Sequence, residues 1–162
     1  MPPTVTETFS PVSVGENVAS TLTITFSNAN GFDLTQSGFT ETVPANLIVQ
    51  TSPAPTTTCT GASGTLTSSA SAVTLTGANI PAKGSCSMTM SVKSPAAGSY
   101  ANTIAANALS TASAGGNSAS ASASLTVTAP KSGGGALDWL DMMFVVGVLL
   151  AGRRHTGRRS AR

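Results

Sequence analysis

Charged side chains are scarce in this 162-residue chain, since only 9% of its residues are Asp, Glu, Lys or Arg, against about a quarter in an average protein. Aromatic residues make up 4%. Residues 1–130 hold four acids and two lysines, a formal charge of −2, and so offer no basic patch for a phosphate backbone. We therefore expect no nucleic-acid partner. A chain this poor in charge is typical of an exported surface molecule.

Histidine is nearly absent, which excludes most nucleophilic catalysis. The single histidine, His155, lies in the C-terminal tail, so residues 1–130 cannot supply a Ser/His/Asp triad. The acids of this part fall in three different segments, which does not suit glycoside chemistry. We expect no enzyme activity and no cofactor. The acids are Glu7, Glu16, Asp33 and Glu41.

The chain has two cysteines, Cys59 and Cys86. They are too few for a structural zinc site, so no metal is expected there. One disulfide would imply an oxidising compartment and would stabilise the fold by about 3–4 kcal/mol by closing a loop of about 28 residues. Two buried free thiols are the alternative.

Apolar and hydroxyl residues alternate in four segments of residues 1–130, as expected of strands with one buried face. The segments are 20–28, 71–77, 85–93 and 122–128. Turn-forming stretches rich in Gly, Pro, Asn and Ser separate them. No helical periodicity precedes residue 136. The sequence therefore predicts an all-β fold, an immunoglobulin-like antiparallel β-sandwich over residues 1–130, followed by a short C-terminal apolar helix.

Two local motifs have a structural and a functional interpretation. The stretch "NANGFD", from Asn28 to Asp33, resembles a calcium loop but lacks its closing acid, and a hairpin turn with left-handed backbone angles is the favoured interpretation. Tyr100 follows "AAGS" at the start of a late strand. Its hydroxyl is expected to bond back to an upstream backbone group, which is a structural role.

A third constellation involves Lys83, Lys93 and Asn102. Some pilin-like surface β-sandwiches form an internal Lys–Asn amide beside a buried acid, and Glu7 or Glu41 could approach Asn102. The favoured alternative is exposed lysines and an asparagine that is simply hydrogen-bonded.

Several motifs occur in one order: "PPTVTETFSPVSV", "STLTITFSN", "FTETVP", "TTTC", "IPAKGSCSMTMSV" and "AGSYANTI". Through these motifs, the segment 2–128 resembles the conserved repeat domain of bacterial surface proteins, which is the domain-of-unknown-function family numbered eleven and its near relatives. The resemblance implies a stalk or adhesion module without catalytic residues. It also implies that Cys59 and Cys86 are the family's paired cysteines.

The C-terminal part changes character abruptly. Residues 131–135 are a Gly-rich linker, residues 136–152 are predicted to be a membrane-inserting helix, and residues 153–162 are predicted to be an Arg-rich cytoplasmic tail. A short core helix and a nucleic-acid-binding arm are the alternatives. The residues expected to orient the segment are Trp139, Arg153, Arg154, Arg158 and Arg159.

A glycine joint, a short apolar helix and terminal arginines resemble the tripartite sorting signals of Gram-negative bacteria. The similarity is to the Gly-Gly type, which a rhomboid-like intramembrane protease handles, and it covers residues 132–162. It implies a transient membrane anchor that is cut at locally unwound backbone. The expected joint is Gly133, Gly134 and Gly135.

The N-terminal stretch "MPPTVTETFS" has neither a basic region nor an apolar core, so it is no signal peptide, and we expect the chain to be a fragment or a mis-started frame of a longer exported protein. The sequence thus predicts a non-enzymatic structural or adhesive module at the cell envelope or surface of a Gram-negative bacterium. Its expected partners are the membrane, a sorting protease, and neighbouring repeat domains or a cell-surface ligand. Alternatives are a permanently anchored carbohydrate- or protein-binding domain, and an accessory domain of an enzyme encoded upstream.

Overall fold

The computed structural model describes residues 1–61 and 65–131, and Met1–Pro130 form one compact unit. The regular elements of this described part are all strands, so it contains no helix that could cross a bilayer. The predicted helix 136–152 lies outside the described residues. The strands are β1 (Thr4–Ser10), β2 (Ser13–Gly15), β3 (Ser20–Asn28), β4 (Leu34–Thr42), β5 (Ile48–Val49), β6 (Thr56–Thr57), β7 (Thr65–Ser68), β8 (Ala72–Ile80), β9 (Gly84–Lys93), β10 (Gly98–Ile104) and β11 (Ala121–Thr128).

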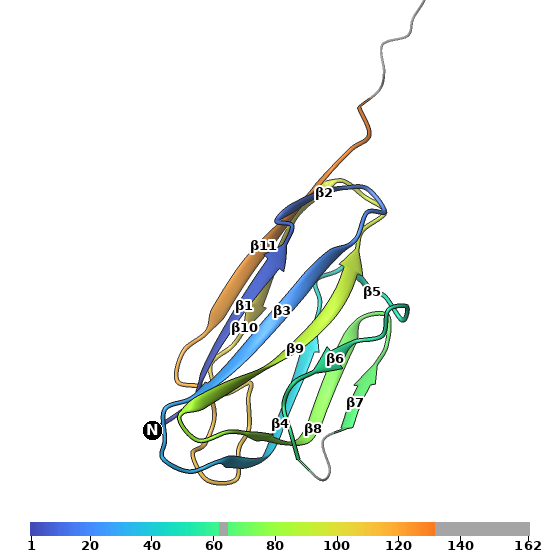
Figure 1. Ribbon diagram of the computed structural model, residues 1–162. Coiled ribbons are helices and arrows are strands. Elements are labelled where there is room, and N and C mark those ends of the chain that lie inside the picture. The colour runs from blue at the N-terminus through green and yellow to red at the C-terminus, as the bar shows by residue number, and fades with distance from the viewer. Residues whose placement is uncertain (62–64, 132–162) are drawn as a thin grey trace, which may run out of the picture. The chain divides into compact units, whose positions relative to one another are not determined.

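The strands form three hydrogen-bonded sheets. The largest has the order β1-β3-β9-β5, with β6 also pairing with β9. The other two have the orders β10-β11-β2 and β4-β8-β7. In Figure 1, β1, β3 and β9 lie side by side in one layer, with β4, β8 and β10 behind them. The predicted all-β sandwich is confirmed.

Alternation in the strands builds the core between the layers. In β3 the apolar residues Leu22, Ile24 and Phe26 are fully buried, while the threonines between them face outward. Phe26 meets Phe39 of β4 edge to face, with ring centroids 5.1 Å apart, and so joins the two layers. Burial of these side chains is the main stabilising term of the domain.

The connection from β3 to β4 crosses between the layers, since β3 pairs with β1 and β9 whereas β4 pairs with β8. The expected hairpin at "NANGFD" is therefore wrong. No residue of this stretch adopts a left-handed backbone angle. The side chain of Asn28 shapes the turn instead: its amide nitrogen donates to the carbonyl oxygens of Phe32 (2.8 Å), Pro81 (3.1 Å) and Ile80 (3.3 Å).

The second layer consists of two separate sheets, β4-β8-β7 and β10-β11-β2, and no ladder joins β4 of one to β10 of the other. The boundary between these two sheets is called the seam below. A single antiparallel bridge between Gly38 and Ser110 crosses the seam at one end. At β4, the register shifts around Gln36, which has a positive φ of 50°. Backbone hydrogen bonds at Gly38–Ser110 and Thr35–Ala112 cross the seam at this end, and the side chain of Asn102 crosses it farther along to reach Glu41.

Candidate functional site

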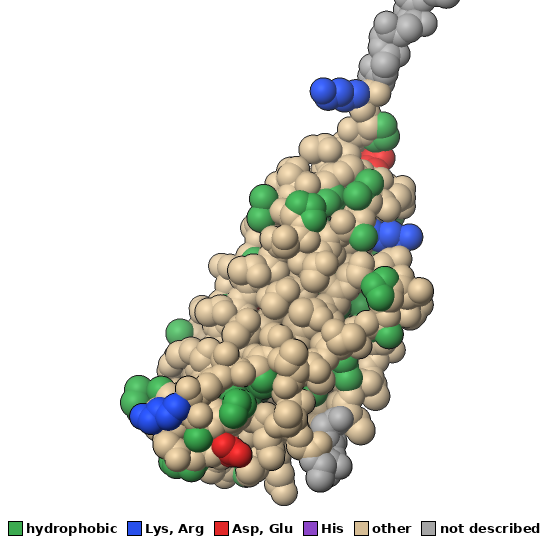
Figure 2. Space-filling model, viewed as in Figure 1, with side chains coloured by type: hydrophobic (Ala, Val, Ile, Leu, Met, Phe, Trp, Pro, Cys, Tyr) green, Lys and Arg blue, Asp and Glu red, His purple; other side chains and the backbone are tan. Residues whose placement is uncertain are grey.

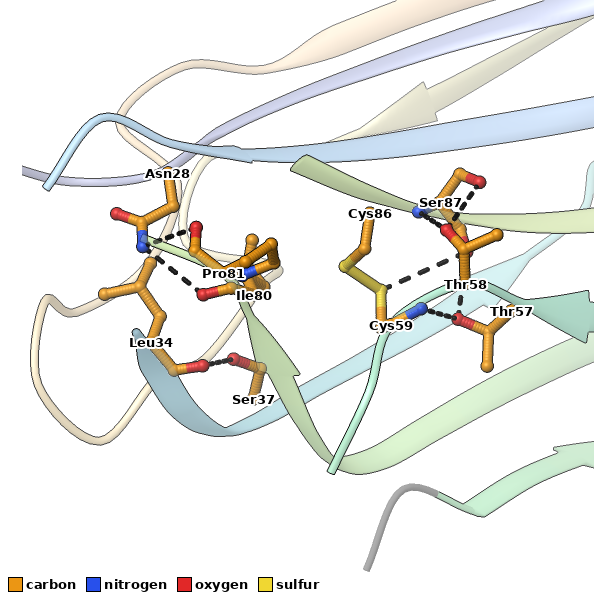
Figure 3. The surroundings of a disulfide bond; sticks show 10 residues. All are labelled: Asn28, Leu34, Ser37, Thr57, Thr58, Cys59, Ile80, Pro81, Cys86 and Ser87. Carbon is orange, nitrogen blue, oxygen red and sulfur yellow. Dashed lines mark hydrogen bonds between the residues drawn. A yellow bond between two sulfur atoms is a disulfide. The ribbon is translucent and has the colours of Figure 1, made fainter. Parts of the chain in front are cut away.

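A disulfide joins Cys59 to Cys86. The predicted disulfide is therefore confirmed, and the alternative of two free thiols is wrong. It connects the segment after β6 to the inward face of β9, with the two Cα atoms 4.8 Å apart (Figure 3). Beside it, the Thr57 hydroxyl accepts from the Cys59 amide (3.1 Å) and donates to the Ser87 carbonyl (2.9 Å). The bridge and these hydrogen bonds attach the β5–β6 segment to the front sheet.

Tyr100 has the geometry expected from its position at the start of β10. Its hydroxyl donates to the carbonyl oxygen of Ala96 at 2.7 Å and accepts from the hydroxyl of Ser94 at 2.9 Å. Both hydroxyl-bearing side chains are buried. The arrangement fixes the turn between β9 and β10, as expected for a structural role.

Replacing Tyr100 with phenylalanine is expected to lower the free energy of unfolding by about 1 kcal/mol, because the Ala96 carbonyl and the Ser94 hydroxyl lose a buried partner. Urea unfolding followed by circular dichroism measures the change. Thr126→Val, an exposed strand position without a side-chain hydrogen bond, serves as the control. An unchanged midpoint for Tyr100→Phe would contradict the assigned role.

Two buried carboxylates share one amide at the seam. The side-chain nitrogen of Asn102 donates to Oε2 of Glu7 at 2.5 Å and to Oε1 of Glu41 at 2.7 Å. The three residues come from β10, β1 and β4, one from each of the three sheets. Their side chains are 1%, 6% and 3% exposed, in the order Asn102, Glu7, Glu41. Oε1 of Glu7 is buried without a partner.

Among the described residues, no cation lies beside the cluster to offset its charge. Lys83 lies in the β8–β9 turn, Lys93 lies opposite Ile48 at the end of β9, and the terminal amine of Met1 bonds to Asn30. Neither lysine reaches Asn102, so the Lys–Asn amide considered above is not formed. What the chain does bring to Asn102 is both of the acids considered as its neighbours.

Burial raises the pKa of both carboxyl groups. For Glu41 the rise is to about 7, opposed by the hydrogen bond from Asn102 and increased by the nearby Glu7 carboxylate. For Glu7, burial raises the pKa while hydrogen bonds from Asn102 and from the Ile104 amide oppose the rise. The cluster therefore holds a proton at pH values where exposed carboxyl groups are ionised. A small hollow of about 130 Å³, lined in part by Glu41, Thr103 and Ile104, lies beside the cluster. A metal-binding group of three or more His, Cys, Asp or Glu side chains is absent from the described residues.

The outer face of the front sheet consists of hydroxyl side chains. Every outward residue of β1 and β3 is Ser or Thr, and so is every one on β9 except Lys93. Figure 2 shows this face without charged side chains along its middle, and the charges lie toward the two ends. The hydroxyls stand in rows across the strands: Thr4–Ser27–Ser85, Thr6–Thr25–Ser87, Thr8–Thr23–Thr89 and Ser10–Thr21–Ser91.

A hollow of about 230 Å³ opens on this face beside β6. On the sheet side the hollow is lined by Thr21, Thr89, Met90 and Ser91, and on the side of the β5–β6 segment by Pro53, Ala54 and Thr56. The hollow was not predictable from the sequence, because the β5–β6 segment shows no periodicity and its position depends on the disulfide and on the pairing of β5 and β6 with β9. The hydroxyl alternation of β3 and β9 was the available signal.

The remaining predicted site residues lie outside the described part of the chain. These are the glycine joint and the orienting residues of the tail: Gly133, Gly134, Gly135, Trp139, Arg153, Arg154, Arg158 and Arg159.

Comparison with known proteins gives a family and a fold. The family described as "Domain of unknown function (DUF7933)" matches residues 3–127, whereas the family numbered eleven, named above from the residues, is not shown. A search of curated proteins gave no match.

Three solved structures illustrate the likeness in fold. A cohesin module from a Clostridium perfringens family 33 glycoside hydrolase has a TM-score of 0.55 and 11% identity, covering 79% of this chain and 98% of the other. A non-cellulosomal cohesin from Archaeoglobus fulgidus has a TM-score of 0.51 and 11% identity, covering 79% and 92%. The collagen-binding domain of a Staphylococcus aureus adhesin has a TM-score of 0.50 and 9% identity, covering 78% and 97%. At these identities the likeness concerns the fold alone.

Proposed function

This chain belongs to the DUF7933 family, and we propose that it is a non-enzymatic structural or adhesive module of an exported bacterial surface protein. The observation that carries the proposal is the combination of a disulfide-linked sandwich with an outer sheet face of uncharged hydroxyls. A disulfide persists in an oxidising compartment, outside the cytoplasm. The described residues contain no arrangement of nucleophile and base. The similar folds of cohesins and of a collagen-binding adhesin domain support a binding role.

The second part of the proposal concerns residues 131–162, as a sorting tail. Their sequence has a glycine joint, an apolar run and an arginine cluster, which suit a transient anchor with the arginines in the cytoplasm. A rhomboid-like protease of a Gram-negative cell envelope would cut at the glycines. The alternative is a permanent anchor that holds a carbohydrate- or protein-binding domain at the membrane surface.

Intact mass spectrometry tests both parts at once. The full chain, produced behind an added signal peptide in a Gram-negative host that has such a protease, is expected to lose everything after the glycine stretch. The released domain is expected to be 2 daltons lighter than the reduced form because of the Cys59–Cys86 bridge.

A variant with leucine in place of Gly133, Gly134 and Gly135 is the matched control and is expected to stay uncut in the membrane fraction. An uncut, membrane-bound parent chain would favour the permanent anchor. A soluble, uncut chain with free thiols would overturn both parts of the proposal.

A further inference from the structure

We propose that the hydroxyl face of the front sheet, together with the hollow beside β6, is a binding site for a neutral polysaccharide chain. The inference deepens the adhesive role proposed above, because it names the chemical class that the module would hold.

The composition of the face favours a neutral, hydroxyl-rich partner. Soluble proteins usually cover an exposed sheet face with Lys, Glu and other charged residues, but here the outward residues of β1, β3 and β9 are Ser and Thr, with Lys93 at the far end. An anionic polymer would find no cation along the middle of the face (Figure 2). Protein interfaces are typically centred on aromatic residues, Met or Arg, none of which projects from this face.

Spacing makes the face a regular array of hydrogen-bonding groups. Neighbouring strands lie about 4.8 Å apart, and outward residues of one strand recur about every 6.6 Å. Each hydroxyl has one donor hydrogen and two acceptor lone pairs. The rows therefore offer donors and acceptors in two directions, and the hydroxyls of a neutral sugar chain can pair with both kinds of group.

The hollow lies at one end of this array, beside the last row of hydroxyls. Its volume of about 230 Å³ is below the roughly 300–1,000 Å³ of pockets for drug-sized ligands, so it suits one sugar ring whose chain continues across the open face. Pro53 and Ala54 offer an apolar wall for the C–H face of a ring.

Two hydroxyls lining the hollow are free to bind. Thr56 and Thr89 bond to each other at 2.7 Å. The side-chain hydroxyls of Thr21 and Ser91 make no hydrogen bond to any described residue of the chain, and both line the hollow. These two hydroxyls are the expected direct contacts of the sugar.

The test is binding of the full chain, in detergent, to oligosaccharide probes followed by nuclear magnetic resonance or calorimetry. Linear neutral hexasaccharides of glucose, mannose and N-acetylglucosamine serve as probes, and hexagalacturonate is the anionic comparison. At least one neutral probe is expected to bind and to shift the amide signals of Thr21, Thr89 and Ser91, whereas hexagalacturonate is expected not to bind.

Variants locate the site. The double variant Thr21→Val/Ser91→Ala is expected to weaken binding about fivefold or more, since each lost hydrogen bond contributes at least about 0.5 kcal/mol. Ala54→Arg, at an exposed position, is expected to abolish binding by filling the hollow. Thr126→Val, exposed on β11 of the other layer, is the matched control and is expected to bind as the parent does.

Three outcomes would overturn the inference: binding of none of the neutral probes, tighter binding of hexagalacturonate, or equal losses in the Thr126→Val control. A loss with Thr74→Val instead would place the site in the second hollow, over β4 and β8, and would also overturn it. Such failures would leave the mass-spectrometric test of the exported module unaffected, so the two proposals fail separately.

Discussion

Replacing Cys59 and Cys86 together with alanine is expected to lower the free energy of unfolding by about 3–4 kcal/mol. The two residues are 27 positions apart in the chain, and the bridge restricts the unfolded chain by closing this loop. It also attaches the β5–β6 segment, whose two-residue strands have few ladder hydrogen bonds of their own. For a domain of this size the melting temperature is expected to fall by roughly 10–15 °C.

Thermal unfolding of the parent with and without a reducing agent provides the control. Reduction of the parent is expected to reproduce the fall, and the double alanine variant is expected to be insensitive to the reductant. If the parent melted at one temperature under both conditions, the disulfide would not stabilise the fold as argued. Loss of the bridge is also expected to weaken glycan binding, because Pro53 and Ala54 of the same segment wall the hollow.

The domain is expected to be about 2 kcal/mol more stable at pH 5 than at pH 8. The pKa of Glu41 is about 7 in the folded protein against an ordinary 4.5, so between these values the folded state holds a proton that the unfolded chain has released. Stability is therefore greatest below about pH 4.5 and is lost as the pH rises through 7. One pKa unit corresponds to about 1.4 kcal/mol, which sets the order of magnitude of this difference.

Urea unfolding at several pH values measures this slope. Glu41→Gln is expected to flatten the profile and to raise stability at pH 8, because the glutamine oxygen still accepts from Asn102 but carries no charge. Glu16→Gln is the matched control: Oε1 of Glu16 accepts from the Ala97 amide at 2.9 Å, away from the cluster, and the parent's slope is expected to persist. The same slope in Glu41→Gln as in the parent would show that this carboxyl group does not govern the pH dependence.

Strand positions were largely predictable because alternation is a local property. The predicted segment 20–28 coincides with β3 (Ser20–Asn28), and the segment 85–93 lies within β9 (Gly84–Lys93). A backbone in extended conformation places successive side chains on opposite faces whatever surrounds it. β4 was not predicted from alternation, since its irregular register at Gln36 disrupts the pattern.

The partners of individual side chains were predictable only in part. In β1, Val5, Glu7 and Phe9 have the same parity, so the sequence places Glu7 on the inward face together with two apolar residues. The sequence does not explain why an acid occupies this buried position. The reason is Asn102, which is 95 positions away in the chain and belongs to a different sheet.

The sequence by itself determined the class of the fold, the hydroxyl character of the outer face and the exclusion of most catalysis, because these depend on composition and on the local period of two. Tertiary structure alone decided that β3 and β4 lie in different layers, that one asparagine bridges two buried acids, and that the β5–β6 segment walls a hollow. Each of these depends on contacts between residues remote in the chain, and the energy of a contact is defined only when the whole sandwich has closed.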